Sequence, residues 1–285
     1  MKFSALRDIK RPRFWRLFAT HTFSCLGAVA FLFGLYDVLR PNAISKVNFP
    51  FAAAIAVFSI IYASVRSYPR PVEEAYTKPN TMIRIVEGDL FSQPENVVVG
   101  MTTTFDTQIP HIINPGSIQG QFLAKVYAND VAALDSDLAR GLISVTPSGH
   151  IQKPGKGIRY PIGTIVTIRQ ARKHYFCVAY GEMDAANQAQ ATMDGIWRSL
   201  ENLWREVRAH TNGDPVAIPV VGGGLARLSQ IFPAQDSIRF IAMSFMFASR
   251  HTRVCDRLDI VVRPQDVERL DMLELQAFLT SLKEI

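Results

Sequence analysis

The chain has 285 residues, of which 48% are hydrophobic, and its formal net charge is +6. This length suits one ordinary globular domain together with a smaller unit, and the composition excludes a disordered or fibrous protein. The positive charge is concentrated in the first sixteen residues, so it does not indicate a nucleic-acid-binding face. Three cysteines, Cys25, Cys177 and Cys255, lie too far apart for a CxxC metal site or a disulfide framework. We therefore expect free thiols in a reducing compartment and no metal.

Two apolar segments near the N-terminus are long enough to cross a membrane. Residues 17–39 are interrupted by His21 and Asp37, near the two ends of the segment, and residues 49–66 form a second apolar run. About 20 apolar residues suffice for a helix to span the hydrocarbon core. The short polar link between the runs makes two such helices antiparallel, so residues 1–66 are predicted to form a transmembrane hairpin. A cleaved signal peptide is the alternative, but the first run is too long for one and the second has no role in one.

The distribution of basic residues predicts the orientation of this hairpin. The basic cluster before the first run, together with Arg66, Arg70 and Lys78 after the second, outweighs Arg40 and Lys46 in the link. Basic residues accumulate on the cytoplasmic side of a membrane. Both termini and the domain that follows are therefore expected in the cytoplasm.

Small residues fall on one face of the second run, at Ala52, Ala56, Ser59 and Ala63. In lipid, such a stripe lets helix backbones approach closely, because packing rather than the hydrophobic effect drives association there. The stripe suits closure of the hairpin and assembly of several chains equally well.

A proline-containing stretch of mixed charge, residues 67–80, is interpreted as a juxtamembrane linker. Beyond it, residues 81–285 alternate between β-branched runs and helix-like segments. This alternation predicts an α/β domain with a mixed, largely parallel sheet and helices on both faces. The expected strands are 82–91, 96–103, 160–169, 173–181, 215–224 and 257–264, and the expected helices are 119–140, 189–210, 232–247 and 267–282.

Two glycine-containing loops follow predicted strands, at the place where open α/β sheets bind ligands. One comprises residues 115–120 and leads into a helix, and the other comprises residues 221–227. Glycines let backbone N–H groups point into a concavity that holds phosphate oxygens. Such turns are also ordinary connections, and neither loop has the following lysine of a P-loop. A third feature is Asp89, directly after the first strand, which can accept a hydrogen bond from an adenine amine or cap the next turn.

The order of these features resembles the macro domain, an ADP-ribose-binding module, over roughly residues 81–264. The resemblance implies that Asp89, with the adjoining Leu90, contacts the adenine and that the two glycine loops hold the diphosphate. Phe232 is matched to an aromatic residue near the distal ribose. The residues that the resemblance assigns to the diphosphate are Gly116, Ser117, Ile118 and Gln119 in the first loop and Gly222, Gly223, Gly224 and Leu225 in the second.

One segment departs from the hydrolytic members of that family. They usually carry an Asn-Ala-Ala-Asn-like run after the second strand, where this chain has Gly-Met-Thr-Thr-Thr-Phe-Asp at residues 100–106. Threonine hydroxyls are poor general bases without an activating partner, so no catalytic residue is predicted. Thr103, Thr104, Asp106 and Arg227 are instead expected to line the part of the site beyond the distal ribose.

Two transmembrane helices followed by a macro domain with the runs GDLF, MTTTFDT and PVVGGG are similar to the membrane effectors of type II Thoeris antiphage defence. The resemblance implies a partner TIR-domain enzyme that makes an amino-acid conjugate of ADP-ribose from NAD, in the described case a histidine conjugate. It also implies that the bound signal leads to homo-oligomer assembly and disruption of the bacterial inner membrane. No cofactor and no nucleic acid are expected.

Two other functions are compatible with the sequence. A membrane-anchored ADP-ribosyl hydrolase or deacylase would need Asp106 as a general base. A nucleic-acid or poly-ADP-ribose binder would need basic charge on the soluble domain, whereas the basic residues cluster beside the membrane segments.

Overall fold

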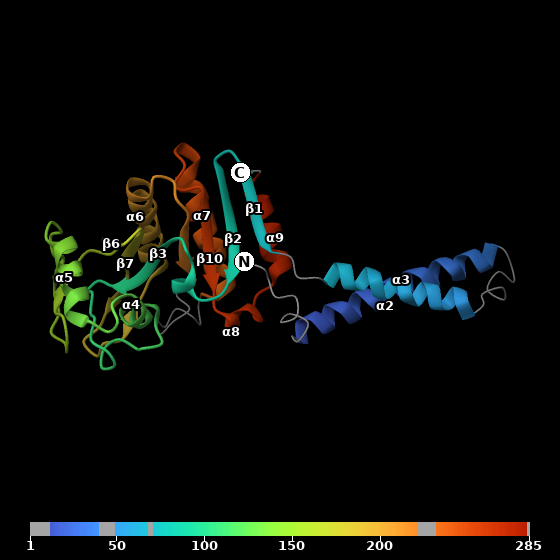
Figure 1. The fold of residues 1–285 in the computed structure, drawn as a ribbon, viewed down its shortest axis with the longest axis horizontal. Coiled ribbons are helices and arrows are strands. Elements are labelled where there is room, and N and C mark those ends of the chain that lie inside the picture. The colour runs from blue at the N-terminus through green and yellow to red at the C-terminus, as the bar shows by residue number, and fades with distance from the viewer. Residues whose placement is uncertain (1–11, 40–48, 68–70, 222–231, 284–285) are drawn as a thin grey trace. The chain divides into compact units, whose positions relative to one another are not determined.

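A computed structural model describes residues 12–39, 49–67, 71–221 and 232–283. The chain divides into two compact units, Met1–Arg70 and Pro71–Ile285. The first contains two long helices, and the second contains a sheet with helices on both faces (Figure 1).

The N-terminal unit consists of α2 (Pro12–Leu39) and α3 (Phe49–Ser67), which pack side by side in opposite directions (Figure 1). Phe33 and Phe51 meet edge to face, with their ring centroids 5.5 Å apart. Both helices are long and apolar enough to cross a membrane, each with a mean hydropathy of 1.7 over its most apolar stretch. Two candidate spans therefore fit the predicted hairpin.

The small residues of α3 are only partly buried. Ser59 and Ala63 are fully buried, whereas Ala52 and Ala56 are exposed, so only the second half of the predicted small-residue stripe packs within the hairpin. Small side chains let the two helix backbones approach closely. The apolar side chains that α3 leaves more than half exposed include Val57, Phe58 and Ile61. Such an exposed apolar surface suits lipid rather than water.

The C-terminal unit is built on a mixed sheet with the strand order β1-β2-β10-β9-β3-β7-β6, and a short β8 pairs with β7. From β2 to β7 in this order the strands run parallel, whereas β1 and β6 pair antiparallel at the two edges. The mixed α/β sheet predicted from the sequence is confirmed. The strands are β1 (Val72–Thr77), β2 (Asn80–Glu87), β3 (Asn96–Thr102), β6 (Ile165–Gln170), β7 (Lys173–Met183), β8 (Ala189–Gln190), β9 (Val216–Pro219) and β10 (Arg257–Val262), and a separate pair is formed by β4 (Gly149–His150) and β5 (Ile158–Arg159).

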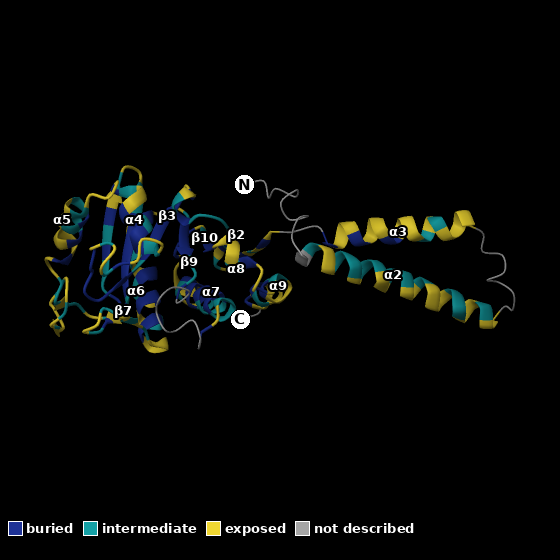
Figure 2. Ribbon diagram, turned by 90° about the horizontal axis from the view of Figure 1, so that it is seen from below, coloured by how far each residue is buried: buried dark blue, intermediate teal, exposed yellow. Residues whose placement is uncertain are grey.

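Helices cover both faces of this sheet, so its strands lie in the buried middle layer (Figure 2). Side chains along a strand alternate between faces. In β3, Val98 accordingly packs into one core, whereas Val97 and Val99 pack into the other. The first core includes α6 (Met193–Thr211), α7 (Ala234–His251) and α9 (Met272–Ser281), and the second includes α4 (Ile118–Val126) and α5 (Val131–Leu142).

The expected helix 119–140 is two helices, α4 and α5. Ala128 and Asn129 between them have φ angles of 51° and 67°, a left-handed backbone that interrupts the helical hydrogen bonds. Asp130 then starts α5 by accepting the N–H of Ala133 at 3.0 Å. The apolar pattern continues across this break, which is why sequence periodicity alone predicted one helix.

The C-terminal helix and the linker also differ from the sequence interpretation. The segment expected as helix 267–282 contains the end of α8 (Pro264–Val267) and then α9, because Asp271 caps a new helix start. The segment assigned to the linker, 67–80, contains β1. Val72 and Tyr76 of β1 are both buried, so this strand belongs to the folded unit.

Candidate functional site

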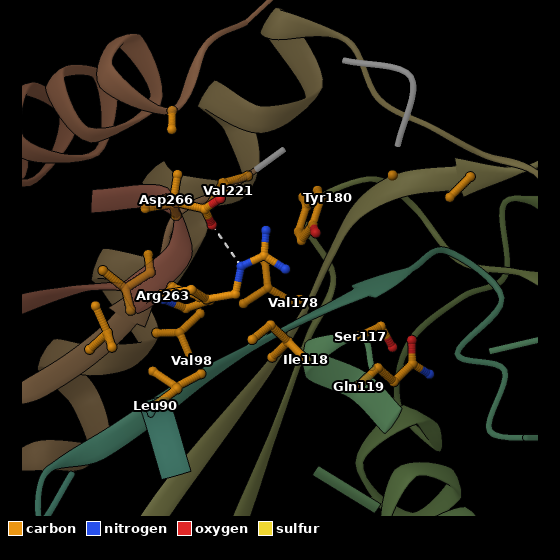
Figure 3. Close-up of a pocket in the computed structure, with 18 of the residues that line it drawn as sticks. Leu90, Val98, Ser117, Ile118, Gln119, Val178, Tyr180, Val221, Arg263 and Asp266 are labelled. Atoms are coloured by element: carbon orange, nitrogen blue, oxygen red, sulfur yellow. Dashed lines mark hydrogen bonds and ion pairs between the residues drawn. The ribbon is translucent and has the colours of Figure 1, made fainter. Parts of the chain in front are cut away.

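A cavity of about 1180 Å³ lies along the carboxyl ends of the parallel strands. Its lining includes Asp89 after β2, Arg263 after β10, Thr102 at the end of β3 and Tyr180 in β7. Figure 3 shows side chains from these neighbouring strands and from the start of α4 around one space. Open α/β sheets bind ligands at this edge, and the volume suits a ligand of nucleotide size.

Asp89 both lines this cavity and caps the turn that follows it. It is the N-cap of the short helix η2 (Leu90–Ser92), where its Oδ1 accepts the N–H of Phe91 at 3.2 Å. Its Oδ2 accepts hydrogen bonds from Nζ of Lys125 at 2.6 Å and from Oγ of Ser92 at 3.0 Å. Burial opposes the charged form of Asp89, but these donors hold its pKa below the ordinary value. The carboxylate is therefore an ionised acceptor at neutral pH.

The first glycine loop leads into the N-terminus of α4. Ser117 is the N-cap of α4 and accepts the N–H of Gly120 at 3.0 Å, while Oδ1 of Asn114 accepts the N–H of Gly116 at 2.7 Å. A helix N-terminus attracts anions through its free N–H groups and its dipole. The predicted residues of this loop that line the cavity are Gly116, Ser117, Ile118 and Gln119, three of which are labelled in Figure 3.

Gln119 contributes to this wall in a way that the sequence does not reveal. Its side chain is buried, and its Nε2 donates a hydrogen bond to the backbone carbonyl of Asp106. The side chain therefore ties α4 to the segment after β3.

Thr103, Thr104 and Asp106 lie behind the cavity surface. In the described part of the chain, the cavity lining includes Thr102 but none of these three residues. Each of the three is at most 2% exposed. These three residues, which were predicted to contact a ligand, therefore do not reach the cavity surface. Only the adjacent Thr102 reaches it.

Asp106 is held by a buried set of donors. Its Oδ2 accepts hydrogen bonds from Oγ1 of Thr104 at 2.5 Å and from Nζ of Lys153 at 2.8 Å, and its Oδ1 accepts the N–H of Lys156 at 2.8 Å. The side chains of Lys153 and Asp106 are 0% and 1% exposed. These contacts occupy both carboxylate oxygens of Asp106 and bury them away from the cavity.

Tyr180 is a cavity residue that the sequence analysis did not select. Its ring lies over Gly100 of β3, where a Cβ atom would come within 2.1 Å of the ring. Only glycine leaves this space, and both residues line the cavity. The two positions are far apart in the sequence, and only the pairing of β3 with β7 brings them together.

Charged side chains from the C-terminal helices form another wall that the sequence analysis missed. Arg263, directly after β10, donates from Nε to Oδ2 of Asp266 at 2.7 Å and extends into the cavity (Figure 3). Arg239 of α7 pairs with Asp236 at 2.7 Å and also with Glu274 of α9. All five residues line the cavity. Arg263 could have been selected from the sequence, because it directly follows a strand, as Asp89 nearly does.

The second glycine loop cannot be placed in this cavity in the same way. Gly222, Gly223, Gly224, Leu225 and Arg227 lie outside the described residues. The residues on either side, Val221 and Phe232, both line the cavity.

The described lining offers hydrogen bonds, backbone N–H groups and paired charges. Among the residues that the structure describes, no cluster of three His, Cys, Asp or Glu side chains is arranged to hold a metal ion. Asp89 has a lowered pKa, and Asp106 lies outside the lining. This arrangement is suited to binding an anionic, hydrogen-bonding ligand.

Comparisons with known proteins agree with this description. The chain is similar in fold to a solved Oceanobacillus iheyensis macrodomain carrying an asparagine-to-alanine substitution, with a TM-score of 0.50, 14% identity, and coverage of 76% of this chain and 96% of that chain. A glycine-to-valine mutant of the same macrodomain with ADPR also has a TM-score of 0.50 at 14% identity, and the match covers 75% of this chain and 100% of that chain. The folded unit therefore has the macro-domain fold.

The family follows from a more specific match. Residues 83–263 match the family described as Thoeris protein ThsA, Macro domain. The Thoeris protein ThsA of Bacillus amyloliquefaciens (strain Y2) is 23% identical over 203 residues, which cover 69% of this chain and 67% of that protein. The chain belongs to the ThsA macro domain family.

Proposed function

We propose that this protein is an antiphage-defence membrane effector whose macro domain binds a signal derived from ADP-ribose. The observation that carries the proposal is the nucleotide-sized cavity, which is lined by Asp89 and by the N-terminus of α4. Membership of the ThsA macro domain family supports the defence role. The related fold of a macrodomain solved with ADPR supports the class of ligand.

The chemistry of ADP-ribose matches two parts of the cavity lining. Asp89 accepts a hydrogen bond from the adenine amine, beside the apolar side chain of Leu90. The diphosphate lies at the N-terminus of α4, where free N–H groups and the helix dipole stabilise negative charge. The proposed diphosphate contacts are Gly116, Ser117, Ile118 and Gln119, together with Gly222, Gly223, Gly224 and Leu225.

In this proposal, the protein is a sensor without catalytic activity. A hydrolase would need a general base beside the distal ribose. Asp106 was the candidate, but its carboxylate is buried, accepts three hydrogen bonds and does not line the cavity. This arrangement supports binding rather than turnover.

A continuous set of contacts connects the cavity with the strand that follows the membrane helices. Glu274 lines the cavity from α9 and pairs with Arg239. The same helix holds β1, because the hydroxyl of Tyr76 donates to the carbonyl of Leu279 at 2.8 Å and Oγ1 of Thr280 donates to Glu74 at 2.7 Å. In the sequence, β1 begins five residues after the end of α3. A ligand that shifts α9 would therefore act on the segment attached to the membrane helix.

The remaining steps complete the proposal. A partner TIR-domain enzyme makes the signal, which is a histidine conjugate of ADP-ribose. Both termini and the macro domain face the cytoplasm, and α2 and α3 span the inner membrane. The ligand favours an assembled homo-oligomer that disrupts the membrane, which requires tighter binding to the assembled state than to the resting one. The exposed Ala52 and Ala56 on α3 offer a close-packing surface for assembly.

The test is a calorimetric titration of the purified full-length protein in detergent with ADP-ribose and with its histidine conjugate. Each ligand is recovered after several hours and analysed chemically. The expected result is saturable binding of an unchanged ligand, with dye release from vesicles that contain the protein. Consumption of either ligand would instead favour the hydrolase, and absence of binding by both would reject the proposed ligand class.

A further inference from the structure

Arg263 brings a positive charge into the cavity from the strand next to Asp89. It directly follows β10, which pairs with β2. Its side chain lines the cavity and is 46% exposed, so a ligand in the cavity has access to the guanidinium group. In Figure 3 this group points into the space that Ile118, Val178 and Tyr180 surround, and Ile118 is the first residue of α4.

Asp266 sets the direction of this guanidinium group. Its Oδ2 accepts a hydrogen bond from Nε of Arg263 at 2.7 Å. Nε is the nitrogen nearest the aliphatic stem, and the two terminal amino groups extend further into the cavity than Nε does (Figure 3). A side chain that is already oriented loses less conformational entropy when it binds a ligand.

Two other cations of the lining are weaker candidates for binding an anionic group. Arg239 pairs with two carboxylates, those of Asp236 and Glu274, which together offset its single charge. Lys125 pairs at 2.6 Å with the carboxylate that the proposed function assigns to the adenine. Arg263 is therefore the best placed of these three cations.

The diphosphate of ADP-ribose calls for a cation in addition to the N-terminus of α4. Each of its phosphate groups carries a negative charge, whereas a helix N-terminus is equivalent to roughly half an elementary charge. The ionised Asp89 lines the same cavity and repels phosphate. Arginine is suited to phosphate, because two of its N–H groups can bind two oxygens at once. A guanidinium group in the same cavity supplies the positive charge.

The pair of Arg263 with Asp266 contributes little to folding. Arg263 is the N-cap residue of α8, but its side chain makes no capping hydrogen bond. Both side chains of the pair reach solvent, so the pair contributes at most about 1 kcal/mol to the free energy of unfolding. A variant without the guanidinium group should therefore fold.

We propose that Arg263 binds the diphosphate of the ligand and selects for ligands that carry this group. Its terminal amino groups donate hydrogen bonds to phosphate oxygens, while Asp266 keeps its contact with Nε. The inference rests on the proposed function, which places the diphosphate at the N-terminus of α4. It adds a side-chain cation to the backbone N–H groups of the first glycine loop.

The test measures ADP-ribose binding to the full-length protein in detergent by calorimetry, at low and at high salt concentration. The diphosphate is the only charged group of ADP-ribose at neutral pH, so a change in charge attraction reports on it. Arg263→Met removes the charge, and Arg263→Lys keeps it. Arg253→Met is the matched control, because Arg253 pairs with Asp256 at 2.7 Å, is 44% exposed and does not line the cavity.

At low salt, Arg263→Met should weaken ADP-ribose binding about 10- to 100-fold, the range of a hydrogen bond to a charged group. The loss should be smaller at high salt, which screens the attraction between charges. Arg263→Lys should retain more affinity than Arg263→Met. Arg253→Met should match the original protein at both salt concentrations, and all variants should keep its melting temperature.

Equal affinity of Arg263→Met and the original protein would overturn the inference. A loss that is the same at both salt concentrations and in both variants of Arg263 would also overturn it, because the arginine would then contact an uncharged part of the ligand. If the original protein does not bind ADP-ribose, it is the proposed function that fails.

Discussion

Asp106 and Lys153 form an ion pair whose side chains are both withdrawn from solvent, with Nζ 2.8 Å from Oδ2. The pair joins the segment after β3 to the loop that precedes β5. That loop also approaches closely at Gly155, where a Cβ atom would lie 2.5 Å from Oδ1 of Asp106. The pair therefore holds together the wall behind the cavity, and its expected role is structural.

The first prediction concerns this pair. Asp106→Asn leaves the ammonium of Lys153 buried without its counter-charge, so we expect a loss of about 3–5 kcal/mol in unfolding free energy. Asp106→Asn combined with Lys153→Met should recover part of this loss, because no buried charge remains. Thermal unfolding of the full-length protein in detergent measures the effect.

The matched control for that prediction is Asp194→Asn, which removes an ion pair with Arg198 whose side chains are 68% and 70% exposed. An exposed pair contributes at most about 1 kcal/mol, so this variant should change the melting temperature little. Equal melting temperatures for Asp106→Asn and Asp194→Asn would contradict the structural role of Asp106.

The sequence was sufficient to predict the macro-domain sheet, the two apolar helices and the positions of Asp89 and the first glycine loop. These features depend on local patterns and on the rule that strand ends share one edge. Thr103, Thr104 and Asp106 also follow a strand, but the sequence does not show which side chains turn inward to meet Lys153. The place of Tyr180 in the cavity depends on the pairing of β7 with β3, which has no local signal.

The second prediction tests adenine recognition by Asp89. Asp89→Ala should weaken ADP-ribose binding about 10- to 100-fold, because a hydrogen bond to a charged group contributes about 1.5–3 kcal/mol. The sharper comparison uses inosine diphosphate ribose, in which a carbonyl replaces the adenine amine. The original protein should discriminate against this analogue, whereas Asp89→Ala should bind both ligands with similar affinity.

Lys125→Met is the control for this experiment, because it removes the ion pair with Asp89 and leaves the carboxylate in place. It should preserve discrimination between the two nucleotides. If Asp89→Ala weakens both ligands equally, the residue acts only as the cap of η2.

The third prediction concerns transmission from the cavity to the membrane segment. Tyr76→Phe with Glu74→Gln loosens the attachment of β1 to α9 and to Lys283 just after it, because Tyr76 donates to Leu279 and Glu74 pairs with Lys283 at 2.5 Å. Neither residue lines the cavity. We expect unchanged ligand affinity and reduced ligand-induced dye release from vesicles.

Tyr175→Phe provides the control for loss of a tyrosine hydroxyl elsewhere in the same sheet, since Tyr175 packs against Phe122 with ring centroids 5.1 Å apart. Its dye release should equal that of the original protein. Unchanged release in the Tyr76→Phe, Glu74→Gln variant would show that α9 and β1 do not carry the signal.

The fourth prediction concerns acid sensitivity at His174. Burial, with help from the positive charges of His210 and Arg169, lowers the pKa of His174 below its ordinary value of 6.5. Below pH 6.5 the unfolded chain therefore takes up a proton that the folded protein does not, so stability falls as pH decreases toward the folded pKa. In His174→Gln, the melting temperature should depend less on pH across this interval. The control is His150→Gln, because His150 is exposed. If the pH profile of His174→Gln equals that of the original protein, the acid sensitivity belongs to other groups.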